Sequence, residues 1–115
     1  MHGAVSTIVN GTIRDIPEIE KLGNYPVYAK AVRPISAIGR MEDIAYNVGI
    51  EINGVRIQPG DIVVADRDGV VIIPQQAAQL VAELACELAK AERNFKKLIL
   101  EGKSMYKIFK DESVG

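Results

Sequence analysis

A short hairpin signal in the middle of the chain constrains the fold more than any other feature of the sequence. Residues 50–52 and 55–57 alternate apolar and polar side chains, and only Asn53 and Gly54 separate the two runs. Asn-Gly between alternating runs is typical of a tight β-turn, because both central positions of that turn need a positive φ. The sequence therefore predicts two adjacent antiparallel strands joined by a two-residue turn.

Two more strands are predicted directly after this hairpin. Residues 62–65 and 70–74 are apolar throughout, and the polar turn 66–69 separates them. Because each run is apolar on both faces, the pattern favours strands that are buried in the centre of a sheet.

A long helix is predicted to follow, from about Gln75 to Glu101, with Gly102 ending it. Apolar residues recur along this segment at spacings of three and four, which places them on one stripe of the helix surface. We expect this stripe to cover the sheet, with packing against a partner helix as the less favoured alternative. We expect Cys86 to be a buried, unreactive thiol. The stripe consists of Ala77, Val81, Leu84, Leu88, Ala91, Phe95 and Leu98.

A second short amphipathic segment, 105–109, follows the long helix.

The first third of the chain also indicates strands and a short helix. Residues 4–9 form an apolar, β-branched run that precedes an Asn-Gly turn signal at 10–11, and residues 26–32 form a second run that begins at a proline. Residues 17–22 are amphipathic and also begin with a proline, which suits the first turn of a helix. Residues 35–47 have no regular period and are expected to form a surface loop. The chain is therefore predicted to be an α/β protein.

Length and composition limit the classes of protein and of site. A chain of 115 residues is predicted to form one domain, 1–115, and its net charge of −1 argues against sequence-independent binding of nucleic acid. One cysteine excludes an internal disulfide, and no apolar run reaches the length of a membrane span. These features favour a cytoplasmic protein. The chain has one histidine, His2, so a metal site of two histidines is excluded. His2 itself is expected to have no functional role.

Arg14, Asp15 and Glu18 are the main candidates for a functional site. They follow the first predicted strand, where an arginine can hold an anionic substrate and a carboxylate can hold a divalent metal. The same residues have a structural alternative, because Asp15 and Glu18 have the spacing of a capping box at a helix start. Both interpretations are open from the residues alone. Weaker candidates lie in other predicted loops and turns: Arg33, Arg40, Asp61, Asp66 and Asp68.

Several motifs together resemble one protein family along the whole chain. They are Asn-Gly-Thr-Ile-Arg-Asp at 10–15, Tyr-Pro-Val-Tyr-Ala at 25–29, and the segments 54–66 and 68–74, followed by the glutamate-rich helix. The chain is similar to the C-terminal part of the RraA-like family, which joins the regulator of ribonuclease E activity to the class II 4-hydroxy-4-methyl-2-oxoglutarate aldolases. Members are often described as demethylmenaquinone methyltransferase-like. The resemblance implies a swivelling β/β/α sandwich, here truncated at the N-terminus, that assembles as a trimer or hexamer.

The resemblance also implies a reaction and the residues that carry it. The expected activity is a divalent-metal-dependent lyase that cleaves 4-hydroxy-2-oxo acids to pyruvate and also decarboxylates oxaloacetate. An Arg-Asp-x-x-Glu/Asp signature carries the activity in the aldolases, and it maps onto Arg14, Asp15 and Glu18. Asp15 is then expected to hold Mg²⁺ or Mn²⁺, largely through water, and Arg14 to bind the pyruvyl end of the substrate. Two interpretations of Glu18 remain open, a catalytic role and a place in the capping box.

The chain departs from the family pattern at its N-terminus. The family signature includes a glycine well upstream of the arginine, and only 13 residues precede Arg14, so that glycine and its loop are expected to be missing. Three hypotheses follow. A companion chain supplies the N-terminal half, self-association rebuilds the pocket, or catalysis is lost. In the last case the chain is a non-catalytic regulator that binds a protein partner such as a ribonuclease.

Overall fold

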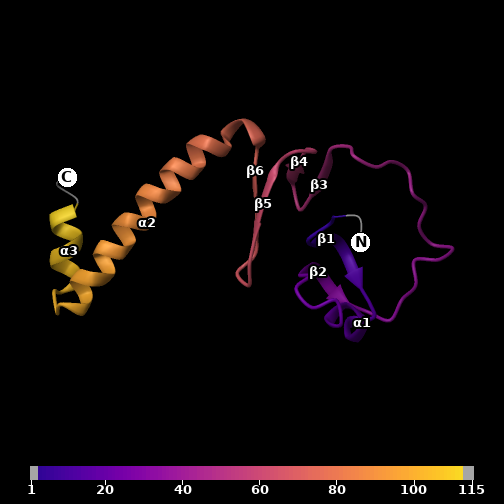
Figure 1. Cartoon of the computed structure of the whole chain (residues 1–115), viewed down its shortest axis with the longest axis horizontal. Helices are drawn as coiled ribbons and strands as arrows, with labels where there is room; N and C mark the ends of the chain where they lie inside the picture. Colours follow the sequence, from indigo (N-terminus) through magenta and orange to yellow (C-terminus); the bar gives the residue numbers. More distant parts are fainter. Residues whose placement is uncertain (1–2, 113–115) are drawn as a thin grey trace. The chain divides into compact units, whose positions relative to one another are not determined.

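The structure is a computed structural model that describes residues 3–112, so His2 lies outside the described residues. The described part is a mixed α/β structure in which small two-stranded sheets precede a long C-terminal helix (Figure 1). Its contacts divide the chain into two compact units. The first contains the chain up to Val48 together with Ile52–Gly54, and the second contains Gly49–Glu51 and the chain from Val55 onward.

A parallel pair of strands connected by a short helix dominates the first unit. Strand β1 (Thr7–Ile13) pairs with β2 (Val27–Val32), and helix α1 (Ile16–Glu20) lies in the connection. Parallel strands require such a crossover, because the chain must return to the same end of the sheet before the second strand begins. The Ser6 hydroxyl donates to the Pro26 carbonyl at 2.8 Å, which fixes the start of β2 beside the start of β1.

The turn predicted at residues 10–11 is wrong, because β1 continues through both of them. Val9 pairs with Ala29 and Thr12 pairs with Ala31, so β1 has one more residue than β2 between these two pairs. A β-bulge absorbs the extra residue. An Asn-Gly pair forms a hairpin turn only where the next strand folds straight back. Here the partner strand arrives after the crossover helix.

The central hairpin is confirmed. Strands β3 (Ile50–Ile52) and β4 (Val55–Ile57) pair with each other, and Asn53 and Gly54 join them with φ angles of 51° and 79°. Two consecutive positive φ angles are those of a type I′ turn, whose twist matches that of the flanking strands. The local sequence therefore determines this element without help from the rest of the chain.

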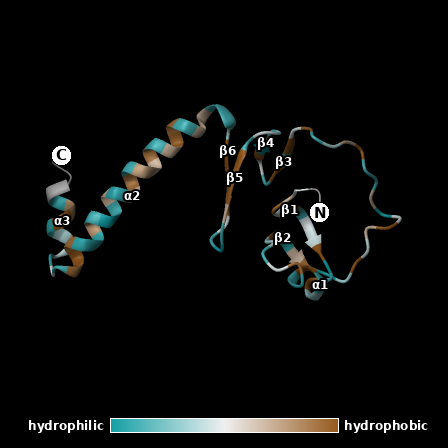
Figure 2. Ribbon diagram, viewed as in Figure 1, coloured by the Kyte–Doolittle hydropathy of each residue, from teal (hydrophilic) through white to brown (hydrophobic). Residues whose placement is uncertain are grey.

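Strands β5 (Ile62–Ala65) and β6 (Val70–Ile73) form an antiparallel pair without a break in register. Their predicted burial in the centre of a sheet is not observed. Val64 is 53% exposed and Val71 is 60% exposed, and Figure 2 shows hydrophobic colour along β5. A strand that is apolar on both faces needs a covering layer on each side. Within this chain these side chains remain open to solvent.

A single turn of 3₁₀ helix, η1 (Gln75–Ala77), leads into the long helix α2 (Ala78–Leu100). Gly102 ends this helix as predicted, with a φ of 84°. The N–H groups of Gly102 and Lys103 return to carbonyls of the last helical turn at 2.9 and 3.1 Å, which is a Schellman arrangement. Neither α2 nor any other described helix combines the length and apolar character that crossing a membrane requires.

Helix α3 (Met105–Glu112) packs against the C-terminal end of α2. Ile108 is 3% exposed and is the one buried apolar residue of the described chain. Beside it, the rings of Phe95 and Phe109 lie 5.3 Å apart between centroids at an angle of 54°. The C-terminal part of the predicted stripe therefore contacts a partner helix.

The predicted cover of a sheet by the rest of the stripe is not observed. Leu84 and Leu88 are 52% and 65% exposed, although Figure 2 shows hydrophobic and hydrophilic bands alternating along α2. Cys86 is exposed, which corrects its predicted burial. The helix therefore has the amphipathic character that the sequence indicates, but residues 3–112 supply no layer over most of its apolar side.

Candidate functional site

The carboxyl ends of β1 and β2 place two arginines next to each other. The last registered pair of these strands is Ile13 and Val32, and Arg14 and Arg33 are the next residues along each chain segment. The Arg33 N–H donates to the Ile13 carbonyl at 2.9 Å, which extends the ladder by one bond. In open α/β sheets, ligands bind at the carboxyl ends of parallel strands. This end of the strand pair is therefore the candidate site.

Asp15 adopts the left-handed backbone conformation, with φ 63° and ψ 40°. Residues other than glycine seldom adopt this conformation, and those that do occur frequently at functional sites. The Asp15 carbonyl accepts the N–H groups of Glu18 and Ile19 at 3.0 and 3.1 Å, whereas its carboxylate accepts no hydrogen bond from the helix. The Asp15 backbone therefore starts α1, and the side chain is left available.

The capping box that the sequence offers as an alternative is not observed. A capping side chain needs a residue with extended backbone angles, and Asp15 is left-handed instead. Glu18, the other half of the predicted box, accepts a hydrogen bond from Lys21 Nζ at 2.6 Å on the exposed surface of α1. The Glu18 side chain is therefore engaged on this helix, and its catalytic role stays a prediction.

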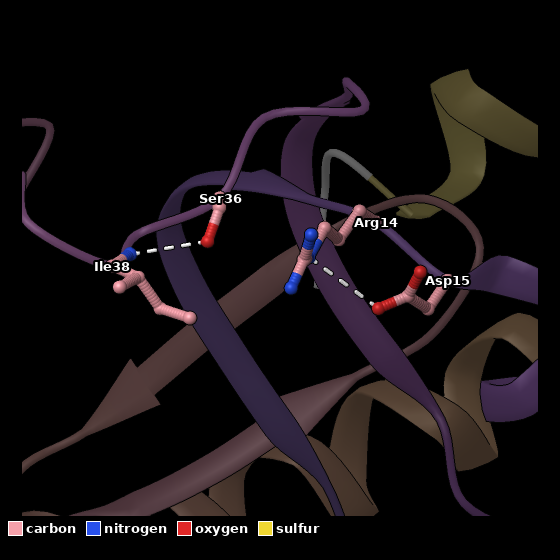
Figure 3. Close-up of polar contacts among 4 residues, drawn as sticks. All are labelled: Arg14, Asp15, Ser36 and Ile38. Atoms are coloured by element: carbon pink, nitrogen blue, oxygen red, sulfur yellow. Dashed lines mark hydrogen bonds and ion pairs between the residues drawn. The ribbon is translucent and has the colours of Figure 1, made fainter.

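The side chains of Arg14 and Asp15 point toward each other (Figure 3). Arg14 Nε lies 3.4 Å from Asp15 Oδ2, and the two side chains are 48% and 65% exposed. An ion pair this exposed contributes less than about 1 kcal/mol to stability. Both groups are therefore free to exchange this weak contact for contacts with a ligand.

A pocket of about 320 Å³, open to solvent, lies at this end of the strands. Two arginines and one aspartate are among the residues that line it, and the other lining residues are apolar. Its volume lies at the lower end of the range of small-molecule sites, which is roughly 300–1,000 Å³. The lining residues are Arg14, Asp15, Ile16, Pro17, Val32, Arg33 and Pro34.

The chain leaves this pocket through a tight turn after β2. The Ile35 N–H donates to the Arg33 carbonyl at 2.9 Å, with Pro34 between them. The Ile38 N–H donates to Ser36 Oγ at 3.1 Å, as Figure 3 shows. These local bonds hold the first part of the predicted surface loop beside the site.

The aspartates that the sequence left as weaker candidates stabilise turns. The Asp61 carboxylate accepts the N–H groups of Gln58 at 2.8 Å and of Gln75 at 3.2 Å. The Asp66 carboxylate accepts the Asp68 N–H at 2.8 Å in the turn between β5 and β6. Each bond satisfies a backbone N–H that the turn would otherwise leave without a partner.

Asp15 is the one acidic residue among those that line this pocket, so its carboxylate is the candidate ligand for a divalent metal. Among the residues that the structure describes, no three His, Cys, Asp or Glu side chains gather into a group that could enclose an ion. Mg²⁺ keeps several waters and is often held by one or two carboxylates together with oxygens of the ligand. Asp15 therefore fits the role of a single protein ligand to a hydrated ion.

Comparisons with known proteins show which family this chain is similar to. A family model described as "RraA-like: Aldolase/RraA" matches residues 1–72, which include the pocket. Protein DlpA of Legionella pneumophila is 32% identical over 104 residues, covering 90% of this chain and 17% of that protein. A protein of Halalkalibacterium halodurans named "Putative 4-hydroxy-4-methyl-2-oxoglutarate aldolase" is 36% identical over 83 residues, covering 72% of this chain and 39% of that protein.

A solved structure has the same fold over most of this chain. It is Streptomyces coelicolor RraAS2, described as an unusual member of the RNase ES inhibitor RraA protein family. The TM-score is 0.75 at 34% sequence identity, and the match covers 83% of this chain and 48% of that chain. The chain therefore spans less than half the length of each of these three relatives.

Proposed function

This chain belongs to the RraA-like family (Aldolase/RraA), and we propose on this premise that it carries the Arg-Asp site of a divalent-metal-dependent lyase. The proposed substrates are 4-hydroxy-2-oxo acids of the 4-hydroxy-4-methyl-2-oxoglutarate type, and pyruvate is a product. One observation supports this most. The Asp15 carboxylate has no part in starting the helix and lines a pocket beside the Arg14 guanidinium.

Arg14 is proposed to bind the carboxylate next to the keto group of the substrate. A guanidinium offers two parallel N–H donors, which match both oxygens of a carboxylate and hold the keto acid in one orientation. Asp15 is proposed to hold a hydrated Mg²⁺ or Mn²⁺, which when bound would polarise the keto oxygen. The apolar side chains of Ile16 and Val32 form walls that limit how the ligand can lie.

Cleavage of such a substrate breaks its C3–C4 bond. The C4 hydroxyl releases its proton to solvent, C4 becomes a carbonyl, and the bonding electron pair remains on C3 as the enolate of pyruvate. Arg14 would keep the neighbouring carboxylate fixed while this charge develops. Protonation of C3 then gives pyruvate. Decarboxylation of oxaloacetate leaves the same enolate, so the same residues are proposed to support both reactions.

Metal-dependent release of pyruvate tests this proposal. The purified chain is mixed with 4-hydroxy-4-methyl-2-oxoglutarate or oxaloacetate, and pyruvate is measured with lactate dehydrogenase and NADH. Rates are corrected for decarboxylation by the metal without protein. We expect turnover with Mg²⁺ or Mn²⁺, its loss with EDTA, and its return with excess metal. Turnover that persists in EDTA would contradict the role of the metal, and no turnover with either metal would contradict the lyase.

The exposed apolar side chains support assembly with other chains. Monomers seldom expose large contiguous apolar patches, and the open edges of two-stranded sheets invite further pairing. We propose that residues 1–115 form one domain, part of a swivelling β/β/α sandwich, once these surfaces are covered. The covering partners would be further copies in a homotrimer or homohexamer, or a companion chain that supplies an N-terminal half.

Sedimentation velocity of wild-type chain and of Val71→Lys tests assembly. Val71 is 60% exposed, so lysine is tolerated in a single chain, whereas in an interface it would bury an unpaired charge. We expect the wild type to sediment as a particle heavier than 12.5 kDa and Val71→Lys to shift toward that mass. Val5→Lys, at a residue 79% exposed, is the matched control and should sediment as the wild type does. A wild type that stays at 12.5 kDa at all concentrations contradicts the homo-oligomer and favours the companion chain.

A second candidate function is regulation of a ribonuclease without catalysis. The similarity to RraAS2 favours it, because the description of that protein names an RNase ES inhibitor family. A regulator of this kind would release no pyruvate with either metal, and it would retain a purified ribonuclease in a pull-down. Pyruvate release without retention of the ribonuclease would favour the lyase.

A further inference from the structure

We propose that Arg33 selects substrates that carry a second carboxylate beyond the 2-oxo acid head. This inference rests on the proposed function and assigns to Arg33 the recognition of the second carboxylate that the proposed substrates carry. Arg14 holds the carboxylate next to the keto group, and Arg33 binds a carboxylate on the part of the substrate that leaves. The substrate is then a dicarboxylic 4-hydroxy-2-oxo acid, and a monocarboxylic one binds less tightly.

The register of the parallel strands brings Arg14 and Arg33 to one pocket. Ile13 pairs with Val32, so Arg14 and Arg33 each stand one position past the last registered pair. Neighbouring strands lie about 4.8 Å apart, and residues at equivalent positions share one face of the sheet. Both arginines line the same open pocket. A ligand held by one of them therefore lies within reach of the other.

The backbone of Arg33 is fixed on both sides, although its side chain is exposed. Its N–H donates to the Ile13 carbonyl, and its own carbonyl accepts the Ile35 N–H, each at 2.9 Å. The guanidinium therefore extends from a Cα atom that does not have to be ordered when a ligand binds. Such preorganisation lowers the entropy lost on binding.

The charges around the pocket favour a ligand with two negative groups. The Arg14 guanidinium has a partner in Asp15, whereas Arg33 forms no ion pair with any side chain that the structure describes. Like charges on neighbouring strands repel each other. A ligand with one carboxylate satisfies Arg14 and leaves Arg33 without a partner. A ligand with two carboxylates satisfies both arginines and removes the repulsion.

Titration calorimetry with two ligands that are not cleaved tests this inference. The probes are 2-oxoglutarate and 2-oxopentanoate, which have the same length and the same 2-oxo acid head and differ only in a terminal carboxylate against a methyl group. Each is titrated into the whole chain with Mg²⁺ present. We expect the wild type to bind 2-oxoglutarate about tenfold or more tightly than 2-oxopentanoate, because hydrogen bonds to a charged group have this magnitude.

Arg33→Gln is expected to remove this preference, because glutamine keeps a polar side chain but loses the charge and the guanidinium group. The matched control is Lys30→Gln, which removes one positive charge from β2 and should leave the preference intact. Three results would overturn the inference. They are equal binding of both probes by the wild type, binding of neither probe, and a preference that survives in Arg33→Gln.

A cleavage assay separates the failure of this inference from the failure of the proposed function. The pair of substrates is 4-hydroxy-2-oxoglutarate and 4-hydroxy-2-oxopentanoate, which again differ in a carboxylate against a methyl group. Pyruvate release from both at equal kcat/KM supports the lyase and overturns the role of Arg33. A binding preference that depends on Arg33, without release of pyruvate from either substrate, supports the role of Arg33 and contradicts the lyase.

Discussion

Replacing Asp15 with asparagine is expected to lower kcat/KM for pyruvate release by at least about 100-fold, because stabilisation of a developing charge by a metal ion contributes several kcal/mol. Asparagine has the same size as aspartate and tolerates the left-handed backbone that this position adopts. The substitution therefore removes only the negative charge. The assay is steady-state release of pyruvate at several Mg²⁺ concentrations, since weaker metal binding would also raise the concentration needed for half-maximal rate.

The matched control is Glu20→Gln, which makes the same change from acid to amide at the exposed end of α1. We expect this variant to keep the wild-type rate. Both variants should keep the wild-type circular dichroism spectrum and melting temperature, because the Asp15 carboxylate makes only an exposed contact with Arg14. If the Asp15→Asn variant releases pyruvate at the wild-type rate, the role assigned to this carboxylate is refuted.

Replacing Arg14 with lysine is expected to lower kcat/KM by roughly 10- to 100-fold, chiefly through a higher KM. Lysine keeps the positive charge but cannot offer two parallel donors to one carboxylate. The loss should therefore appear with every 2-oxo acid tested, whether or not it carries a second carboxylate. This result distinguishes Arg14 from Arg33, whose substitution should affect only dicarboxylic substrates.

Arg56→Lys on β4 is the control for the change of arginine to lysine, because this residue does not line the pocket. Its kinetic constants should equal those of the wild type. An Arg14→Lys chain with an unchanged KM for oxaloacetate would show that the guanidinium does not bind the keto acid carboxylate. A loss confined to dicarboxylic substrates would instead exchange the roles proposed for the two arginines.

The sequence predicted well those elements that local interactions determine. Asn53 and Gly54 form the turn that their residue types favour, since the positive φ angles are set within the turn itself. Gly102 ends the long helix for the same reason. The boundaries of the strands around them follow from the alternation of side chains over a few residues.

Pairing between distant segments could not be predicted in the same way. Residues 10–11 are the same Asn-Gly pair as residues 53–54, but at 10–11 the chain continues as a strand and forms a bulge against β2. The difference depends on which strand pairs with β1, and that partner follows a crossover helix. The register that places Arg33 beside Arg14 has the same origin, which is why the sequence indicated Arg33 only as a weak candidate.

Burial was also beyond what the pattern could decide. The apolar runs at 62–65 and 70–74 and the stripe on α2 identify surfaces that favour contact, but a sequence pattern does not show what covers them. Val64 and Leu88, which belong to these surfaces, are exposed in this chain. The choice between a capping box and a free carboxylate at Asp15 depended on a single backbone angle, φ 63°, which the residue types alone do not fix.

The central claim is tested most directly by measuring how tightly Mn²⁺ binds to the wild type and to Asp15→Asn. The electron paramagnetic resonance signal of the free ion reports how much Mn²⁺ remains unbound. The claim is that Asp15 and Arg14 together hold a divalent metal and a keto acid. We predict that the wild type binds Mn²⁺, that 2-oxoglutarate tightens this binding, and that Asp15→Asn raises the Kd by at least about tenfold. Equal binding of Mn²⁺ by the two proteins, with no effect of the keto acid, would contradict the claim.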